Sequence, residues 1–303
     1  MLEFMNRLIL RSDGRELRRR GTAQFPCSVY RTVLSNYAGW EVPWHWHDEI
    51  ELKLMFKGTA VASCGGDAFF LHAGEGLFLN AHVLHHTCGL DGQDCVLGSI
   101  VFELPLLAGA AGSVFETRYL RPIYGNHALP AVKLTGAVPW QARALEYIRC
   151  AYDACAEESF GYELEVRAGL SRFWKELSCA NEALIAVPRP AETETNARMR
   201  RMLSFLEAHF TGAITPADLA EAAHISPREC FRCFDRIVGM PPMAYLLRRR
   251  ITCAAELLRE TGLPVTEICF RAGFHSPSYF GKRFREQMGC SPQEFRSKNR
   301  PVA

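Results

Sequence analysis

The sequence predicts a multidomain α+β protein, with β structure in the N-terminal part, helices after it and an all-α C-terminal part. Three observations support this prediction. Short apolar runs separated by glycines fill residues 25–102, which is typical of strands joined by turns. Apolar residues recur at helical spacing from about residue 139 onward. The C-terminal region contains a helical unit that occurs twice, with equivalent residues 49 or 50 positions apart.

Length, charge and cysteine content restrict the classes of protein that fit. A chain of 303 residues is enough for about two domains. The net charge is +2, yet residues 198–300 hold 15 Arg and 2 Lys against 10 acidic residues, which leaves the remainder at −5. This asymmetry predicts that the C-terminal region binds a polyanion. The 12 scattered cysteines favour a reducing cytoplasm, and no apolar run suits a signal peptide or a membrane span.

The repeated unit has the pattern of a helix-turn-helix. Its small and apolar positions correspond pairwise: Leu219/Ile268, Ala220/Cys269, Ala223/Ala272 and Ile225/Phe274. Each copy continues with Ser-Pro, in which serine caps a helix and proline begins it. A short helix, a turn and a second helix form a helix-turn-helix, whose second helix can enter the major groove of DNA. Residues 245–259 are predicted to form one long helix between the two units.

The second unit carries a specific set of residues: Ala272-Gly273-Phe274, Ser276-Pro277-Ser278-Tyr279-Phe280, Phe284, Gly289 and Ser291-Pro292. With these residues the C-terminal region resembles the double helix-turn-helix domain of AraC-type (AraC/XylS) bacterial transcription regulators. The resemblance implies that double-stranded promoter DNA is the partner and that each unit reads one major-groove segment. Matching positions imply these DNA-binding residues: Arg228, Phe231, Arg232, Pro277, Ser278, Gly281 and Lys282. Many members of the family have a polar residue at the position of Phe231. Here the phenylalanine is expected to contact thymine methyl groups instead.

A histidine-rich segment stands out in the N-terminal region. If residues 44–56 form one strand, alternation places His45, His47, Glu49 and Glu51 on one face and apolar residues on the other. Four ionisable side chains would be costly inside a dry core, so the pattern predicts a wet or ligand-filled cavity. Downstream of Gly74, Asn80 and His85 supply a second polar cluster.

Two short motifs in this region match a known barrel. Gly39, His45, His47, Glu51 and Gly58 fit the first cupin motif, and Gly74 and His85 fit the ends of the second. The N-terminal region therefore resembles a cupin-like β-barrel, which AraC-type regulators commonly use as a sensor. Asn80 and His82 depart from the usual proline and glycine of the second motif.

Three interpretations of the pocket remain open. The favoured occupant is a small polar effector such as a sugar, with these expected contacts: His45, Trp46, His47, Glu49, Glu51, Asn80 and His85. A divalent metal held by His45, His47, Glu51 and His85 is less favoured, because regulators of the family often keep this pattern without one. A polar network without a ligand is the third interpretation. The alternative to a regulator is a metal-dependent cupin enzyme with a helical appendage.

The expected organisation is a cupin-like sensor barrel at 1–138, a helical dimerisation segment at 139–186, a linker at 187–197 and a double helix-turn-helix domain at 198–303. An apolar stripe is expected to contact a partner helix, to pack on its own barrel, or both: Leu170, Phe173, Trp174 and Leu177. The protein is expected to be a cytoplasmic homodimer without enzymatic activity. RNA polymerase is an expected further partner, and no membrane partner is expected. Effector binding is expected to shift a conformational equilibrium and so change DNA binding.

Overall fold

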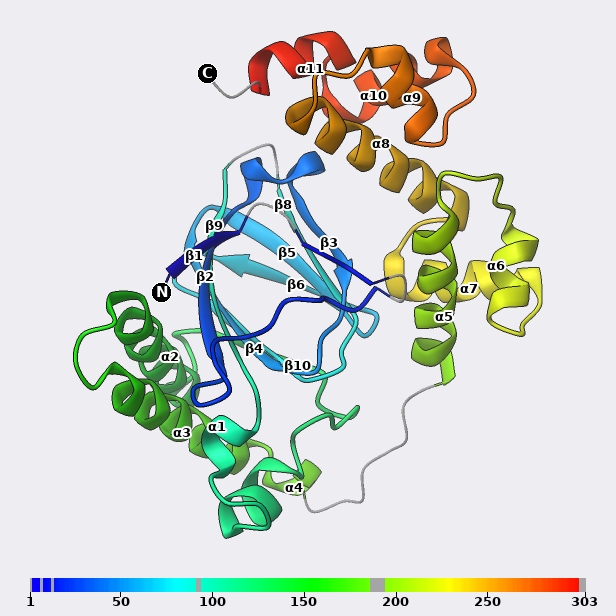
Figure 1. Ribbon diagram of the computed structural model, residues 1–303. Helices are drawn as coiled ribbons and strands as arrows, with labels where there is room; N and C mark the ends of the chain where they lie inside the picture. The colour runs from blue at the N-terminus through cyan, green and yellow to red at the C-terminus, as the bar shows by residue number, and fades with distance from the viewer. Residues whose placement is uncertain (1, 6–7, 12–13, 91–93, 186–193, 300–303) are drawn as a thin grey trace. The chain divides into compact units, whose positions relative to one another are not determined.

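The computed structural model describes residues 2–5, 8–11, 14–90, 94–185 and 194–299. The chain divides into two compact units (Figure 1). The described strands all lie in the N-terminal unit, and the residues from Glu194 onward form a unit in which the described elements are helices. The predicted α+β multidomain class is therefore confirmed. Residues 187–193 of the expected linker lie outside the described residues, and residues 194–197 already belong to a helix.

A six-stranded sheet provides the central layer of the N-terminal unit. Its strand order is β1-β2-β9-β4-β7-β10, and neighbouring strands are antiparallel except for the parallel pair β1 and β2. Strands β4 and β9 pair along nearly their whole length, from Ile50–Phe102 to Lys57–Val96. The bounds are β1 Leu2–Met5, β2 Cys27–Val33, β9 Val96–Phe102, β4 Ile50–Lys57, β7 Gly76–Leu79 and β10 Ala131–Leu134.

A four-stranded antiparallel sheet of order β3-β8-β5-β6 faces the first sheet. One apolar cluster joins the two, with Met55 and Leu97 from the larger sheet and Ala60 and Leu71 from the smaller one. Because each sheet buries one face against the other, the pair encloses an interior in which a site can form. The bounds are β3 Glu41–His45, β8 His85–Gly89, β5 Thr59–Cys64 and β6 Asp67–His72, and the turns Leu34–Asn36 (η1) and Ala38–Trp40 (η2) precede β3.

Helices cover the other face of the six-stranded sheet. Strand β4 is buried on both faces: Ile50, Leu52 and Leu54 belong to the cluster with the helices, whereas Met55 belongs to the cluster between the sheets. Alternation along the strand explains this division, because successive side chains point to opposite faces. The bounds are α1 Pro105–Ala108, η3 Phe115–Leu120, α2 Pro139–Glu157, α3 Tyr162–Ala180 and α4 Glu182–Ile185.

The apolar stripe of α3 packs within its own unit. Leu170, Phe173, Trp174 and Leu177 are at most 3% exposed, and they join the cluster that covers the six-stranded sheet. The indole Nε1 of Trp174 also donates a hydrogen bond to the Tyr119 carbonyl. Of the alternatives expected for this stripe, the structure shows packing on the chain's own sheet, which covers these side chains.

The histidine-rich segment is not one strand. Strand β3 ends at His45, β4 begins at Ile50, and the two strands belong to different sheets. A register shift between Val42 and His45 interrupts the pairing of β3 with β8 just before the chain crosses over. His45 and Glu51 consequently approach each other from facing sheets rather than from one face of one strand.

The C-terminal unit contains seven described helices. Their ends follow local signals: the Thr215 and Asp218 side chains form a capping box at α6, and the Ser226 and Ser276 hydroxyls accept the Glu229 and Tyr279 backbone N–H groups. None of the helices in the described ranges is long and apolar enough to cross a membrane. The bounds are α5 Glu194–His209, α6 Pro216–Ala222, α7 Pro227–Val238, α8 Pro242–Glu260, α9 Val265–Arg271, α10 Pro277–Met288 and α11 Pro292–Asn299.

Candidate functional site

Helices α7 and α10 are the second helices of the two helix-turn-helix units. Each buries one face: Cys230 and Phe234 are buried on α7, and Phe280 and Phe284 are buried on α10. Met288, at the end of α10, is half-buried. The core of each unit thus fixes which residues of the second helix remain on the surface.

The expected DNA-binding residues lie on those remaining surfaces. Phe231 is 44% exposed although it is a large apolar side chain on a helix with a well-formed core. Gly281 is half-buried, and a Cβ added there would have no neighbour within 4 Å. The other six expected residues are exposed: Arg228 and Arg232 with Phe231 on α7, and Pro277, Ser278 and Lys282 on α10.

Arginines on these surfaces are held by weak local pairs. Arg232 Nη1 donates to Glu229 Oε2 at 3.0 Å, and Arg283 Nη1 donates to Glu286 Oε2 at 2.8 Å. Pairs three residues apart on an exposed helix contribute only about 0.3–0.5 kcal/mol. Phosphate can therefore displace the carboxylates at little cost.

The Cys230–Cys233 pair belongs to the packing of α7. Both thiols are buried on the inner face of the helix. Burial raises the pKa of Cys230 to about 11, which disfavours the thiolate that a metal or a redox reaction needs. The structure therefore supports a packing role for this pair.

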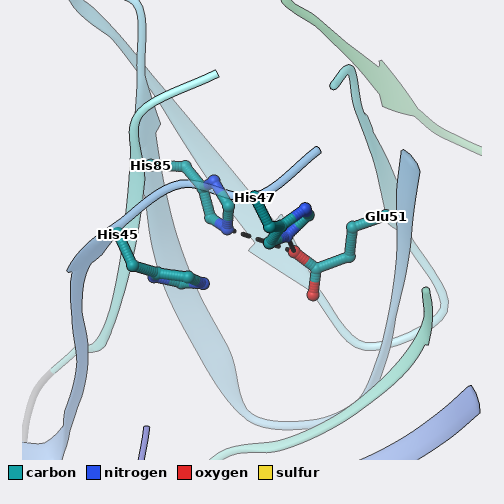
Figure 2. A group of neighbouring side chains, drawn as sticks. All are labelled: His45, His47, Glu51 and His85. Carbon is teal, nitrogen blue, oxygen red and sulfur yellow. Dashed lines mark ion pairs between the residues drawn. The ribbon is translucent and has the colours of Figure 1, made fainter. Parts of the chain in front are cut away.

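In the N-terminal unit, four side chains meet between the two sheets (Figure 2). His45 ends β3, Glu51 lies on β4, His85 begins β8, and His47 lies on the connection between β3 and β4. Their ligand-capable atoms all lie within 4.8 Å of one another, and all four residues are buried. His85 Nε2 lies 3.2 Å and His47 Nε2 lies 3.6 Å from Glu51 Oε2. These are donors that suit a divalent transition metal, so the residues expected from the sequence as metal ligands are brought together.

Backbone carbonyls orient the three imidazoles of this histidine–glutamate cluster. His45 Nδ1 lies 2.8 Å from the Pro43 oxygen, His85 Nδ1 lies 2.9 Å from the Val83 oxygen, and His47 Nδ1 lies 3.1 Å from the Glu49 oxygen. A carbonyl oxygen only accepts, so each Nδ1 carries the proton and donates. In the neutral ring, Nε2 then presents a lone pair.

The charge state of the cluster follows from its burial. Burial and the neighbouring imidazoles lower the pKa of His45 well below its usual value, and burial lowers the pKa of His85 to about 4. Burial disfavours the charged form of Glu51, but the nearby Lys53 ammonium outweighs it and holds the pKa of Glu51 well below the usual range. At neutral pH the cluster therefore contains neutral His45 and His85 rings beside a carboxylate.

A cavity of about 30 Å³ adjoins the cluster. His45, His47 and Glu51 line it together with three charged residues that the sequence interpretation did not include, Glu16, Arg20 and Lys53. Lys53 Nζ donates to Thr87 Oγ1 at 3.1 Å and lies 3.5 Å from Glu51 Oε1. Lys53 could have been found, because it lies two residues from Glu51 on the same face of β4. Glu16 and Arg20 lie outside any regular element, so no periodicity points to them.

The remaining expected effector contacts do not converge on the cluster. Asn80 is buried, and its amide donates to the Ile123 and Leu129 carbonyls at 2.7 and 3.0 Å. Its Oδ1 accepts the Gly125 N–H, so the side chain holds a loop together. Trp46 is half-exposed and stacks near Arg15, at 5.6 Å from ring centroid to guanidinium. The Glu49 side chain is 14% exposed and lies 3.6 Å from His47 Nδ1, on the side of the ring away from Glu51.

Comparison with known families matches both units. The AraC-like ligand binding domain family matches residues 31–173, and the helix-turn-helix domain family matches residues 219–298. The uncharacterized HTH-type transcriptional regulator YdeC of Bacillus subtilis is 28% identical over 295 residues, which span 97% of this chain and 100% of YdeC. The HTH-type transcriptional activator RhaS of Escherichia fergusonii is 26% identical over 84% of this chain and 87% of its own.

Among solved structures, ToxT from Vibrio cholerae is similar over 95% of this chain and 99% of its own, at 14% identity and a TM-score of 0.43. The two family matches follow the order of the two structural units, and the curated relatives span nearly their whole length. The chain therefore belongs to the AraC-type transcription regulators, with an N-terminal ligand-binding domain and a C-terminal helix-turn-helix DNA-binding domain.

Proposed function

We propose that this regulator reads promoter DNA through the exposed faces of α7 and α10. The observation that carries the proposal is the equivalence of the two helices: each begins at a capped Ser-Pro, buries an apolar stripe on one face and leaves basic residues on the surface. Arginine at such a position can bond to guanine edges or to phosphate, and serine can bond to either kind of partner. The proposed contacts are the seven expected ones: Arg228, Phe231, Arg232, Pro277, Ser278, Gly281 and Lys282.

Arg228→Ala is expected to weaken specific DNA binding by about 1–3 kcal/mol, which is roughly 5- to 150-fold. The site is first selected from a random DNA pool, and affinity is then measured by fluorescence anisotropy at several salt concentrations. Arg118→Ala removes an exposed arginine from the N-terminal unit and serves as the matched control. If Arg228→Ala and Arg118→Ala bind alike, or if binding does not weaken with salt, the assignment of α7 to the groove fails.

The cavity beside the histidine–glutamate cluster is the proposed effector site. Its charged lining, which includes Arg20, Lys53 and Glu51, suits a small polar molecule. A single water molecule needs roughly 10–15 Å³ of cavity volume. The cavity, at about 30 Å³, therefore has room for only a few small chemical groups. A sugar would therefore require the cavity to widen. An effector that binds one conformation of the sensor more tightly shifts the equilibrium and changes the affinity for DNA.

A homodimer is the proposed assembly, through apolar residues other than the buried stripe of α3. Phe160, two residues before α3, is fully exposed, and Leu164, in the first turn of α3, is 73% exposed. Replacing both by serine is expected to reduce self-association, measured by sedimentation, because the exposed apolar area is lost. Phe70→Ser removes another half-exposed ring, on β6, as a control. A wild-type protein that sediments as a monomer at all concentrations would contradict the proposal.

A regulatory rather than a catalytic role is proposed for the N-terminal unit, because the relatives are named transcription regulators. RhaS is named a transcriptional activator, so RNA polymerase is the proposed further partner of this chain.

A further inference from the structure

A series of three charged side chains links α5 to the exposed face of α7. Glu229 Oε1 lies 3.6 Å from Arg198 Nη1 on α5, and its other oxygen, Oε2, accepts a hydrogen bond from Arg232 Nη1 at 3.0 Å. The exposure of the side chains increases along the series, from 23% for Arg198 and 28% for Glu229 to 73% for Arg232. The Glu229 carboxylate therefore lies between a half-buried guanidinium of α5 and an exposed guanidinium of α7.

The contact with α5 distinguishes Glu229 from an ordinary surface carboxylate. The exposed pair with Arg232 exchanges easily, because such a pair contributes little free energy. Arg198, in contrast, also donates a hydrogen bond from Nη2 to Glu194, so both of its terminal nitrogens face carboxylates and its guanidinium is held in place. When Arg232 turns toward DNA, the Glu229 carboxylate is therefore still held beside it by Arg198.

We infer that Glu229 is a positioning residue that directs Arg232 toward base edges and away from phosphate. The inference rests on the proposed function, in which Arg232 contacts DNA. A base edge presents uncharged acceptor atoms, whereas a phosphate carries a full negative charge. A fixed carboxylate beside the guanidinium repels the phosphate much more than the base edge. Glu229 thereby lowers the affinity of α7 for DNA of any sequence and raises its preference for one base pair.

The second helix-turn-helix unit has a different pair of residues at the equivalent positions. With an offset of 50 residues, Tyr279 of α10 occupies the position of Glu229. Lys282 occupies the position of Arg232, and a lysine contacts phosphate as a point charge without the planar fork of arginine. The first unit is therefore expected to discriminate between base pairs more strongly than the second.

Base preference, measured with full-length protein, tests the inference. The DNA probes are a site selected from a random pool, its single-base-pair variants and an unrelated duplex. Arg232→Ala identifies the base pair that Arg232 reads, as the position where preference falls. Glu229→Gln keeps the shape of the side chain and is expected to reduce the preference at that base pair by about 3- to 10-fold. Its affinity for the unrelated duplex is expected not to fall, because a negative charge near the phosphates is lost.

Glu286→Gln is the matched control. Glu286 is an exposed glutamate on α10 that accepts a hydrogen bond from Arg283, three residues before it, at 2.8 Å. Arg283 is not among the proposed DNA contacts, so this change should not alter the preference at the base pair that Arg232 reads. Arg198→Met removes the group that holds Glu229 and is expected to reduce the same preference. It should have little further effect in a protein that already carries Glu229→Gln.

Two results separate the inference from the proposed function. If Arg232→Ala lowers the preference at one base pair and Glu229→Gln or Arg198→Met does not, the inference is overturned while the DNA contact of Arg232 stands. Equal losses of affinity for the selected site and the unrelated duplex in Glu229→Gln overturn it too, because they indicate a merely structural role. If Arg232→Ala changes the preference at no base pair, the proposed contact fails and the inference fails with it.

Discussion

Arg20→Met is expected to lower the free energy of unfolding of the N-terminal unit by about 3–5 kcal/mol. Arg20 is 2% exposed, forms an ion pair with the similarly buried Glu16 and donates a hydrogen bond to the Tyr30 hydroxyl at 2.9 Å. Removing the guanidinium leaves the Glu16 carboxylate buried without its counter-charge. A single unpaired charge costs far more in this position than the intact pair contributes.

Tryptophan fluorescence measures this loss selectively, because all five tryptophans lie in the N-terminal unit. Unfolding in urea followed by this signal gives the stability of that unit within the full chain. The double variant Arg20→Met/Glu16→Gln removes both charges and is expected to recover much of the loss. If the single variant costs no more than the double variant, the pair is not buried as the structure describes.

Gly273→Ala is expected to destabilise the C-terminal unit by about 2–5 kcal/mol, the sum of backbone strain and overpacking. Gly273 lies in the turn before α10 with φ +84°, a conformation that L side chains rarely adopt. An added Cβ would lie 2.7 Å from the Thr211 Cα and 2.9 Å from its carbonyl oxygen. These are backbone atoms, so the loop between α5 and α6 would have to move.

Gly289→Ala is the matched control for this change. Gly289 has φ +72°, but an added Cβ meets no atom within 4 Å, so only backbone strain of about 1–2 kcal/mol is expected. Thermal unfolding followed by far-ultraviolet circular dichroism compares the two variants, while tryptophan fluorescence should report an unchanged N-terminal unit. Equal destabilisation by the two variants would show that contact with Thr211 has no effect.

The helical region of the fold was predictable because its signals are local. Ser226 and Ser276 cap their helices through backbone groups three residues away, and the left-handed Gly239 and Gly289 end them. Such signals act within one turn of helix and do not depend on the rest of the chain. Because the helix-turn-helix unit occurs twice, the same local signals for helix starts and ends can be recognised in both copies.

The β region was predictable in class but not in detail, because its details depend on distant contacts. Residues 44–56 alternate as one strand would, yet the chain leaves one sheet at His45 and joins the other at Ile50. The stripe on α3 was equally ambiguous, since an apolar stripe looks the same whether a sheet or a partner helix covers it. The structure assigns that stripe to the chain's own sheet through Phe173, Trp174 and their neighbours.

The sequence predicted that the residues of the cluster lie close together, but the predicted reason, one face of one strand, was wrong. His45, His47, Glu51 and His85 do converge, although the convergence comes from two facing sheets. Asn80 is also polar, but its side-chain amide donates hydrogen bonds to the carbonyls of a loop. These carbonyls lie more than forty residues away along the chain, so the sequence around Asn80 does not reveal them. Arg20 was not predicted because a buried arginine is identified by its partners, and no sequence pattern reveals them.

Adjacent residues of strand β4 face two different layers: one faces the interior between the sheets, and the next faces the helices that cover the six-stranded sheet. Glu51 faces the cluster, and its neighbours Ile50 and Leu52 pack in the layer that contains α2 and α3. Side chains in a close-packed layer move together with the backbone that carries them. A displacement of Glu51 by an occupant of the cluster is therefore also a displacement of Leu52 against the helices, so the signal need not pass through any loop.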